Sequence, residues 1–344
     1  LGDVYKRQGQ DGLIGGSDVS YYKRYNFRVN SEHKMWNGLV TVGEHVGFVW
    51  KDTRGMGTGN IWNNNLRSAF SASPIIPVYD ADGNYNSTVN SDWNVNDGNP
   101  YGNMMVNRYN NSKNGSLDAN VYVQIEPIKN LRFKTVYGIS YGASEYRAYT
   151  PKYQFTPQTA NTVSKVNQSH GHGLSMVWTN TLSYDFNIAT EHHINALIGS
   201  ELSTYDGSNT EGSNTGLIPG FDDWDHAYLV NTNGTENKTV KGSPYDSTRG
   251  MSYFARLGWT WKERYMVNAT MRADGSSKFA KGNRWGYFPS VSAGWTISEE
   301  KFMESVKSWF DFLKIRVSWG QVGNANINCY QYLAPVSTTN TNYN

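Results

Sequence analysis

The chain has 344 residues, enough for one large all-β unit or two ordinary domains, with 14% aromatic residues, 17% charged residues and a formal net charge of +2. This small charge gives no reason to expect a nucleic-acid or strongly acidic partner. The single cysteine excludes an internal disulfide, and the sequence has no run of about 18 apolar residues that would make a transmembrane helix.

The two ends of the sequence suggest a fragment. The first eight residues, LGDVYKRQ, look like translated library-adapter sequence, and residues 1–8 therefore do not enter the fold prediction. The sequence starts without Met and ends in the loop-like string TTNTNYN. We expect residues 9–344 to be one part of a longer protein.

Alternating apolar and polar residues predict a first strand over residues 19–35 and a second over residues 39–51. Trp36-Asn37-Gly38 predicts a tight reversal between them, because Asn-Gly supplies the positive φ that a hairpin turn needs. Glu44 interrupts the apolar face of the second strand. We expect a local bulge or a polar neighbour to accommodate it.

The periodicity disappears between residues 52 and 115. The string NIWNNNLRSAF predicts a short helix that ends before Pro74, and the remainder is rich in Asn, Asp and Gly. A connection of about 60 residues is far longer than usual, which is typical of a functional or disordered loop.

Period-two alternation returns in the second half of the chain and predicts eight further strands. The last four lie between residues 252 and 320, where Tyr253, Ala255 and Leu257 oppose Arg256 and Gly258. The string SEEKFMESVKSW predicts a short helix there, with Ser298 as its cap. The other four strands are predicted at residues 116–126, 131–142, 172–187 and 192–204, with polar loops at 143–171 and 205–249.

The connection lengths alternate between short turns and long loops, as in outer-membrane barrels with short periplasmic turns and long extracellular loops. The fold class predicted is therefore all-β, an antiparallel transmembrane β-barrel segment. Large aromatic residues near the short turns predict an interfacial girdle on the periplasmic side. Its predicted members are Trp259, Trp261, Tyr265, Trp295 and Phe312.

Long strings of the sequence resemble one family. DGSSKFAKGNRWGYFPSVSAGWTISEEKFM followed by LKIRVSWGQVGN is similar to the barrel signature of SusC/RagA-type TonB-linked outer-membrane receptors. Upstream, NIWNNNLRSAFSASPIIPVYDADGNY, VQIEPIKNLRFKTVYG and WTNTLSYDF resemble earlier barrel segments of the same family, in the same order. The resemblance runs from about Asp11 onward.

This resemblance implies a barrel of about 22 strands, of which the chain supplies about ten, without a recognisable plug or amino-terminal domain. It implies import of oligosaccharides or peptides across the outer membrane of a Gram-negative, Bacteroidota-like cell. The implied partners are a SusD-like surface lipoprotein, the TonB complex acting through a plug and TonB box, the lipid bilayer and the substrate. No bond chemistry, cofactor or catalytic residue is implied.

Motifs for metal binding or catalysis are weak in this sequence. His170 and His172 lie at the opposite end of one predicted strand from Glu191, His192 and His193, too far away to share an ion. The run Asp80 to Asn84 starts like a calcium loop, but an Asp-Gly turn explains it better. Asp222, Asp223 and Asp225 could imitate the carboxylates of a glycosidase, yet exposed acidic loops are usually only solvated.

Aromatic and acidic side chains in the predicted extracellular loops are the candidate ligand contacts, because flat rings beside hydrogen-bonding groups suit sugar or peptide capture. These candidates are Trp62, Trp93, Trp224, Asp223 and Tyr228, with Tyr101 and Tyr245 in similar positions. The alternation also leaves open a soluble β-rich carbohydrate-binding or hydrolytic protein, whose apolar faces would pack together in a sandwich.

Overall fold

The computed structural model describes residues 2–8, 19–55, 67, 69–70, 72, 77–87, 99–157, 159–306, 309, 311–329 and 331–333. Strands dominate these residues, and none of the helices among them is long and apolar enough to cross a membrane. The helical segments are α2 (Pro100–Val106) and the 3-10 turns η1 (Trp36–Gly38), η2 (Leu229–Asn231), η3 (Ile297–Glu299) and η4 (Lys301–Val306).

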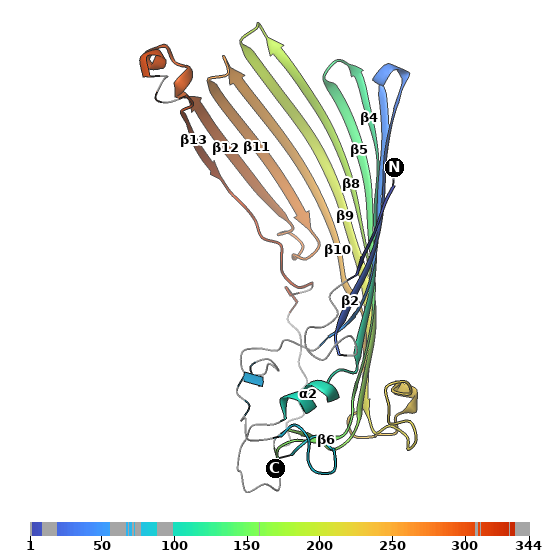
Figure 1. Cartoon of the computed structure of the whole chain (residues 1–344). Coiled ribbons are helices and arrows are strands. Elements are labelled where there is room, and N and C mark those ends of the chain that lie inside the picture. The colour runs from blue at the N-terminus through green and yellow to red at the C-terminus, as the bar shows by residue number, and fades with distance from the viewer. Residues whose placement is uncertain are drawn as a thin grey trace, which may run out of the picture.

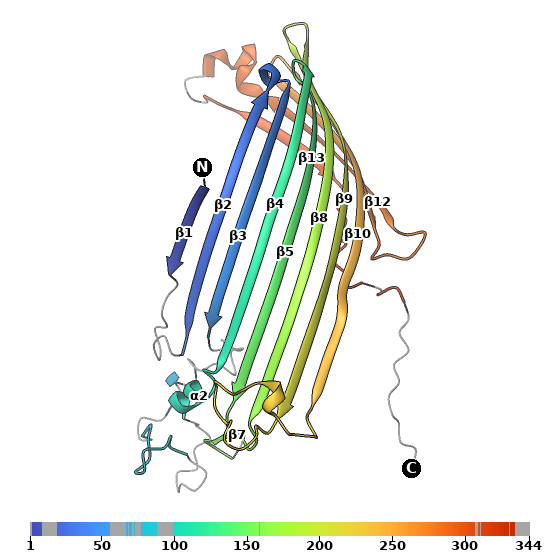
Figure 2. The same ribbon diagram turned by 90° about the vertical axis from the view of Figure 1, so that its right-hand side faces the viewer.

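One 11-stranded antiparallel sheet contains almost all of the strands, in the order β1-β2-β3-β4-β5-β8-β9-β10-β11-β12-β13. It forms a tall curved wall rather than a closed barrel (Figure 1, Figure 2). A separate hairpin, β6 (Tyr153–Gln154) and β7 (Ala160–Asn161), lies between β5 and β8 in the chain. The strands of the large sheet are β1 (Gly2–Gln8), β2 (Tyr21–Met35), β3 (Val40–Arg54), β4 (Asn110–Ile128), β5 (Leu131–Thr150), β8 (Lys165–Ile188), β9 (His192–Thr215), β10 (Thr239–Trp261), β11 (Tyr265–Ser276), β12 (Trp285–Thr296) and β13 (Lys314–Gly320).

The four tightest turns lie at one end of the wall and most longer connections lie at the other, which confirms the predicted asymmetry (Figure 1). The exception is the helical connection from β12 to β13, which lies at the end with the tight turns. The tight turns rely on residues with positive φ, among them Asn37 (54°), Asn130 (68°) and Lys262 (52°). Asn adopts this left-handed conformation at lower cost than most residues, as expected for the Asn37-Gly38 reversal. We call the two ends the short-turn end and the long-loop end.

All ten predicted strands are present, as β2 to β5 and β8 to β13, and β1 is the eleventh. β1 lies in the adapter-like residues 1–8 and pairs with β2 from Gly2 to Gln8. This pairing does not test whether those residues are native, so their origin stays a prediction. Of the helix predicted from NIWNNNLRSAF, Arg67, Ala69 and Phe70 are described and are helical, and its other residues lie outside the described residues.

The two sides of the sheet differ in polarity. Paired residues of an antiparallel sheet lie on the same face, so the register assigns every strand residue to one side. One row joins Tyr184, Ala196, Leu257, Ala269, Val291 and Trp319 across β8 to β13. The next row, on the opposite side, joins Asp185, Asn195, Gly258, Asn268, Ser292 and Ser318. We call these sides the outer face and the lumen face.

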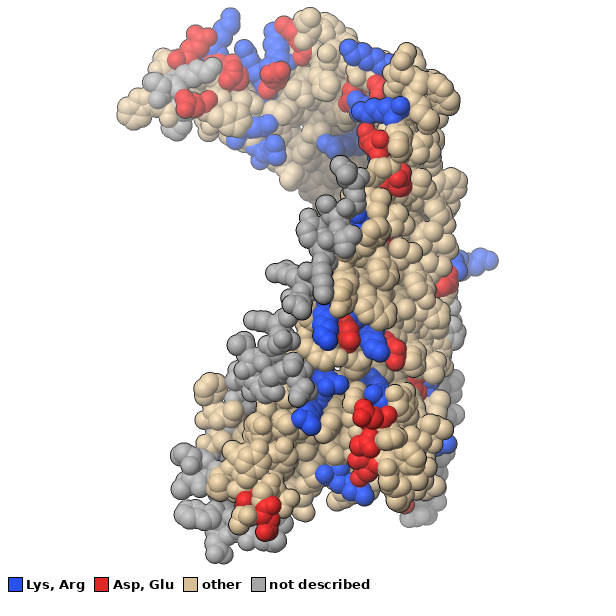
Figure 3. Space-filling model, turned by 45° about the vertical axis from the view of Figure 1, so that its right-hand side comes forward, with Lys and Arg blue, Asp and Glu red and all other residues tan. Residues whose placement is uncertain are grey.

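The outer face carries a band of exposed apolar side chains of membrane thickness. On β8 the outward positions are apolar from Leu174 to Phe186, apart from Asn180, and His170 and His172 follow toward the long-loop end. Twelve steps of about 3.3 Å, tilted by about 45°, span about 28 Å, close to the apolar band of about 25 Å in outer-membrane barrels. Figure 3 shows the corresponding largely uncharged stretch between two charged regions.

This geometry contradicts the sandwich alternative. Within the described residues no second sheet covers the apolar face, and Leu257 and Ile198 are 54% and 58% exposed. The fold is therefore an antiparallel transmembrane β-barrel segment, with one side suited to lipid and the other to water.

The strands extend much further than predicted toward the long-loop end. β8 begins at Lys165, β9 ends at Thr215 and β10 begins at Thr239, so most of the predicted loop at residues 143–171 and about half of that at 205–249 are strand. The alternation pattern missed these strand ends because both faces are polar there. Beyond the apolar band, both sides of the wall meet water. The hydrogen-bonded ladder continues where the apolar alternation stops.

Glu44 lies on the outer face, where a carboxylate is costly, and its side chain accepts a hydrogen bond from Ser31 on the neighbouring strand. This is the polar neighbour that the sequence leads us to expect. On the opposite face, Gly43 leaves room for the Tyr122 ring, because a Cβ there would come within 2.5 Å of it. The Tyr122 hydroxyl then reaches Glu32 Oε2 at 2.6 Å.

The connection between β12 and β13 is helical, as predicted, but it consists of the two 3-10 turns η3 and η4. The predicted cap was wrong: Ser298 lies inside η3, and Thr296 occupies the N-cap position without a side-chain cap bond. Glu300 anchors this connection, since its carboxylate accepts hydrogen bonds from Tyr265 Oη at 2.5 Å and Trp295 Nε1 at 3.1 Å.

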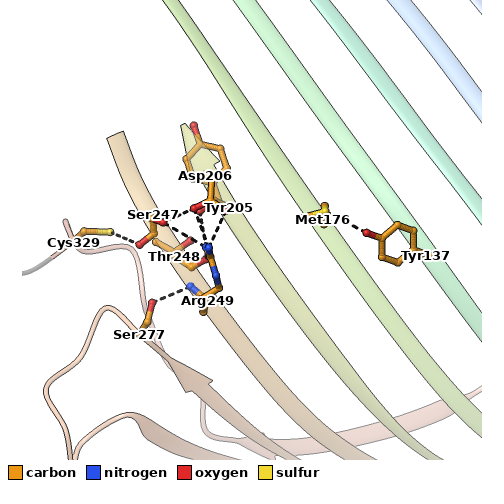
Figure 4. A network of polar contacts seen from close by, with 9 residues as sticks. All are labelled: Tyr137, Met176, Tyr205, Asp206, Ser247, Thr248, Arg249, Ser277 and Cys329. Atoms are coloured by element: carbon orange, nitrogen blue, oxygen red, sulfur yellow. Dashed lines mark hydrogen bonds and ion pairs between the residues drawn. The ribbon is translucent and has the colours of Figure 1, made fainter. Parts of the chain in front are cut away.

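β10 extends further toward the long-loop end than its neighbour β11. The last pair between the two strands is Gly250 with Ser276, whereas β10 begins at Thr239. A register shift between Tyr245 and Thr248 marks this point, and Arg249 bonds there to Asp206 at 2.9 Å (Figure 4). The segment that follows β13 returns to the same place, where Cys329 Sγ donates to the Ser247 carbonyl oxygen at 3.8 Å (Figure 4).

Candidate functional site

A cavity of about 600 Å³ opens at the long-loop end of the wall. It lies between the hairpin around residues 79–85, α2, the end of β5 and residues 222–224. Aromatic residues are the largest group in its lining, and Arg108, Lys152, Asp222 and Asp223 are its charged groups. Such a cavity has the chemistry of a binding site rather than of a catalytic one.

Four rings build one side of the cavity. Tyr79 and Tyr85 are held together by an isolated bridge and stack with centroids 5.6 Å apart. Tyr101 on α2 meets them edge-on at 6.3 and 6.1 Å, and Phe155 meets Tyr85 at 6.3 Å. Edge-to-face and offset contacts at these distances are the favourable aromatic arrangements.

Local hydrogen bonds fix this cluster. Asn99 caps α2 by accepting from Gly102 N at 2.8 Å, and its amide donates to the Val78 carbonyl at 2.6 Å. In the hairpin around residues 79–85, Asp80 Oδ1 accepts hydrogen bonds from the backbone nitrogens of Asp82 and Asn84 at 3.0 and 2.8 Å. The Asp80 to Asn84 run is thus the Asp-Gly turn that the sequence favours, and calcium binding stays untested.

Trp224 forms the other side, clamped between two arginines. The guanidinium of Arg147 lies 3.9 Å from one of its ring centroids and that of Arg54 5.4 Å away, while Tyr109 stacks at 6.2 Å. Arg147 also donates to the Trp224 carbonyl at 3.2 Å and lies 4.2 Å from the Tyr228 ring. Cation–π pairs of this kind contribute about 0.5–2 kcal/mol each.

The loop carrying Trp224 packs on the outer side of the wall. Its Leu217 and Ala227 form a small core with Tyr149 and Val166, whose register places them on the outer face of β5 and β8. In Figure 1 this loop, the yellow segment containing η2, lies on the side of the strands opposite to α2. Trp224 therefore reaches the cavity from outside the wall.

Two acidic residues of this loop are already engaged. Tyr149 donates to Asp222 Oδ1 at 3.1 Å, and Asp223 accepts from His226 Nδ1 at 2.8 Å. The hydrogen bond from His226 lowers the pKa of the Asp223 carboxyl below its usual value. Both carboxylates thus serve to shape the loop, an arrangement unlike the free acid and base of a glycosidase.

The structure brings together only some of the predicted ligand contacts. Trp224 and Asp223 line the cavity, Tyr228 lies beside Arg147, and Tyr101 supports the tyrosine cluster. Trp62 and Trp93 lie outside the described residues, and Tyr245 lies on β10. A ligand role for all of these residues stays a prediction.

Sequence reasoning missed the main lining groups, which are Tyr79, Tyr85, Tyr109, Tyr149 and Phe155. The high frequency of Tyr in the polar stretches was the available signal. All five lie in stretches predicted to be loops, but the sequence offers no local feature that separates them from other loop aromatics. Tyr149 is in fact the penultimate residue of β5.

Four of the five predicted girdle residues, together with His192, form a stacked ribbon at the short-turn end. Trp261 stacks on Tyr265 at 5.3 Å, Tyr265 on Trp295 at 6.3 Å, and His192 lies 5.9 Å from both Trp259 and Trp261. The register places all five on the outer face. Phe312 lies outside this ribbon, in the coil before β13, and is 69% exposed. Membrane contact of the five predicted residues stays a prediction.

No group of three or more His, Cys, Asp or Glu side chains that could hold a metal occurs among the residues that the structure describes. His172 lies near Ser208, and His193 bonds to Asn187 at 2.9 Å. These histidines make ordinary polar contacts.

Taken together, the sheet and its cavity define a class: the wall of a large outer-membrane-type β-barrel with a binding cavity at its long-loop end. Comparisons with known proteins narrow this class. No family model matches the chain. It is 28% identical over 349 residues to TonB-dependent receptor P26 of Formosa agariphila, a match that covers 97% of this chain and 32% of the relative. A shorter match of 94 residues is 47% identical to TonB-dependent receptor SusC of Bacteroides thetaiotaomicron, covering 27% of this chain and 9% of that protein.

Solved structures agree on the fold. The RagAB peptide importer in its open-open state superimposes with a TM-score of 0.77 at 20% identity, over 99% of this chain and 36% of the matched chain. The resemblance to SusC/RagA-type TonB-linked outer-membrane receptors is thereby confirmed. The chain spans about a third of the length of the relatives that it matches along its whole length.

Proposed function

We propose that this chain is part of the barrel wall of a TonB-dependent importer that takes up oligosaccharides or peptides through the outer membrane of a Gram-negative, Bacteroidota-like cell. The observation that carries the proposal is the division of one continuous sheet into an apolar outer face and a polar lumen face. Such a wall separates lipid from a watery passage. In this role the protein binds and passes its substrate and makes or breaks no covalent bond.

A SusD-like surface lipoprotein is the proposed partner at the long-loop end. Support comes from the similarity to SusC and from the fold shared with RagAB. The cavity between the tyrosine cluster and Trp224 lies at this end, where an external partner could deliver a ligand. The proposed energy source is the TonB complex, acting through the plug and TonB box that the family resemblance implies.

The test uses the full-length parent protein in its own cells. We expect it in the outer-membrane fraction, and we expect uptake of its oligosaccharide or peptide mixture to stop when the gene for TonB is deleted. Recovery of the protein in the soluble fraction without detergent would overturn the membrane assignment. Undiminished uptake without TonB would instead indicate a passive porin.

A further inference from the structure

Two cations face each other on the lumen face near one edge of the wall. Arg24 on β2 and Lys51 on β3 are direct register partners, and Arg28 follows two lumen positions along β2. We call Arg24 and Lys51 the doublet. Their strand neighbours Tyr25 and Trp50 point to the outer face, so the doublet lies at the level where the apolar band ends. Like charges placed directly opposite each other in a sheet destabilise it.

Among the side chains that the structure describes, no carboxylate forms an ion pair with Arg24 or Lys51. Arg24 Nε bonds to the neutral amide oxygen of Asn26 at 2.7 Å. Asp52 follows Lys51 but lies on the outer face, where Tyr21 and Asn111 bond to it at 3.1 and 2.7 Å. Arg28 has the acidic register partner Asp3 on β1, and Asp118 lies two strands away in the same row, where it accepts from Ser140 at 2.5 Å. Arg24 and Lys51 have no acidic register partner, since Arg24 lies between Arg7 and Lys51, and Lys51 lies between Arg24 and Asn114.

The row that contains the doublet continues into a polar groove. From Lys51 it passes through Asn114, Ser144 and Gly171 to Asn209 on β9. A second cavity of about 580 Å³ follows this row, and Ser140, Ser175 and Tyr205 contribute further hydroxyl groups. Four strand spacings of about 4.8 Å give the row a length of about 19 Å. A chain of several sugar or amino-acid units fits along it.

We propose that this groove binds the imported ligand on the lumen side and that Arg24 and Lys51 form an anion subsite for a carboxylate or sulfate on that ligand. The guanidinium fork of Arg24 can hold two oxygens of such a group, and Lys51 adds a point charge. The hydroxyls and amides of the groove bond to the uncharged part of the ligand. This inference rests on the proposed function and specifies its substrate class as acidic.

The test measures binding to the purified full-length protein with two matched pairs of probes. One pair is a hexameric oligogalacturonate and its methyl ester, and the other is a hexapeptide of Glu and its Gln counterpart. We expect one charged probe to bind about tenfold or more tightly than its neutral match at low salt. The double variant Arg24→Gln/Lys51→Gln removes this preference, while Arg256→Gln, a lumen-facing change at the short-turn end, keeps it.

Equal affinity for both members of each pair, absence of binding by either charged probe, or a preference that survives the double variant would each overturn the subsite. Thermal unfolding of the double variant checks its folding, and removal of the like-charge pair should leave it at least as stable as the unmodified protein. Because these measurements need no energised membrane, TonB-independent uptake would refute the proposed function without touching this result.

Discussion

The substitution Val291→Arg tests whether the outer face lies in lipid. Val291 is on the outer face of β12, 47% exposed, four residues from Trp295 and four from Tyr287. It is thus about 13 Å along the strand from either ring, at about 3.3 Å per residue, in the middle of the apolar band. An arginine at the bilayer midplane of a barrel costs about 2–4 kcal/mol. This free energy lowers the folded-to-unfolded ratio by roughly 30- to 900-fold, at about 1.36 kcal/mol per factor of ten.

The matched control is Ser292→Arg, one residue further along the same strand but on the lumen face between Asn268 and Ser318. The assay is denaturant-dependent folding of the full-length protein into lipid vesicles, followed by tryptophan fluorescence. We expect a loss of about 2–4 kcal/mol for Val291→Arg and a small change for Ser292→Arg. Equal losses, or a larger loss for Ser292→Arg, would refute the assignment of faces.

Three further predictions concern single contacts. The hydrogen bonds from Tyr265 and Trp295 lower the pKa of Glu300 below its ordinary value of 4.5, so the stability that Glu300 contributes is complete above that pH and lost as pH falls through the lower folded value. Glu300→Gln should therefore flatten the acid limb of the unfolding curve, and an unchanged limb would exclude this anchor. Trp224→Ala removes the ring held by Arg54 and Arg147 and should lower ligand uptake without lowering barrel assembly; unchanged uptake kinetics would argue against a ligand role. Ser247→Cys on β10 should form a disulfide with Cys329, the only cysteine of the sequence, which a mobility shift on a non-reducing gel would show. The control Ser213→Cys, on the neighbouring strand β9, should form none.

The architecture was predictable where one side of a strand meets lipid. In the band from Leu174 to Phe186 the two faces differ strongly, and period-two alternation is visible in the sequence. Beyond Leu174 both sides meet water, so neither face needs apolar residues and the pattern fades although the ladder continues to Lys165. The sequence therefore predicts ten of the eleven strands of the large sheet, and it predicts the strands that run past the apolar band as too short.

The candidate site was less predictable, because its parts come from segments far apart in the chain. Trp224 could be singled out as a loop aromatic, but its partners Arg54 and Arg147 lie on β3 and β5, about 170 and 77 positions away. No local pattern encodes such contacts. The same holds for the doublet of Arg24 and Lys51, which becomes visible only when the register of β2 and β3 is known.

Cysteine accessibility along β12 tests the central claim, a wall between lipid and water, most directly. In a Cys329→Ser background of the full-length protein, single cysteines replace Ser290, Val291, Ser292 and Ala293, and a membrane-impermeant maleimide is added to the folded protein in vesicles. Labelling should alternate, with Ser290 and Ser292 reactive through the watery lumen and Val291 and Ala293 protected by lipid. Uniform labelling of all four positions, or protection of the two serine positions with reaction at the other two, would contradict the account.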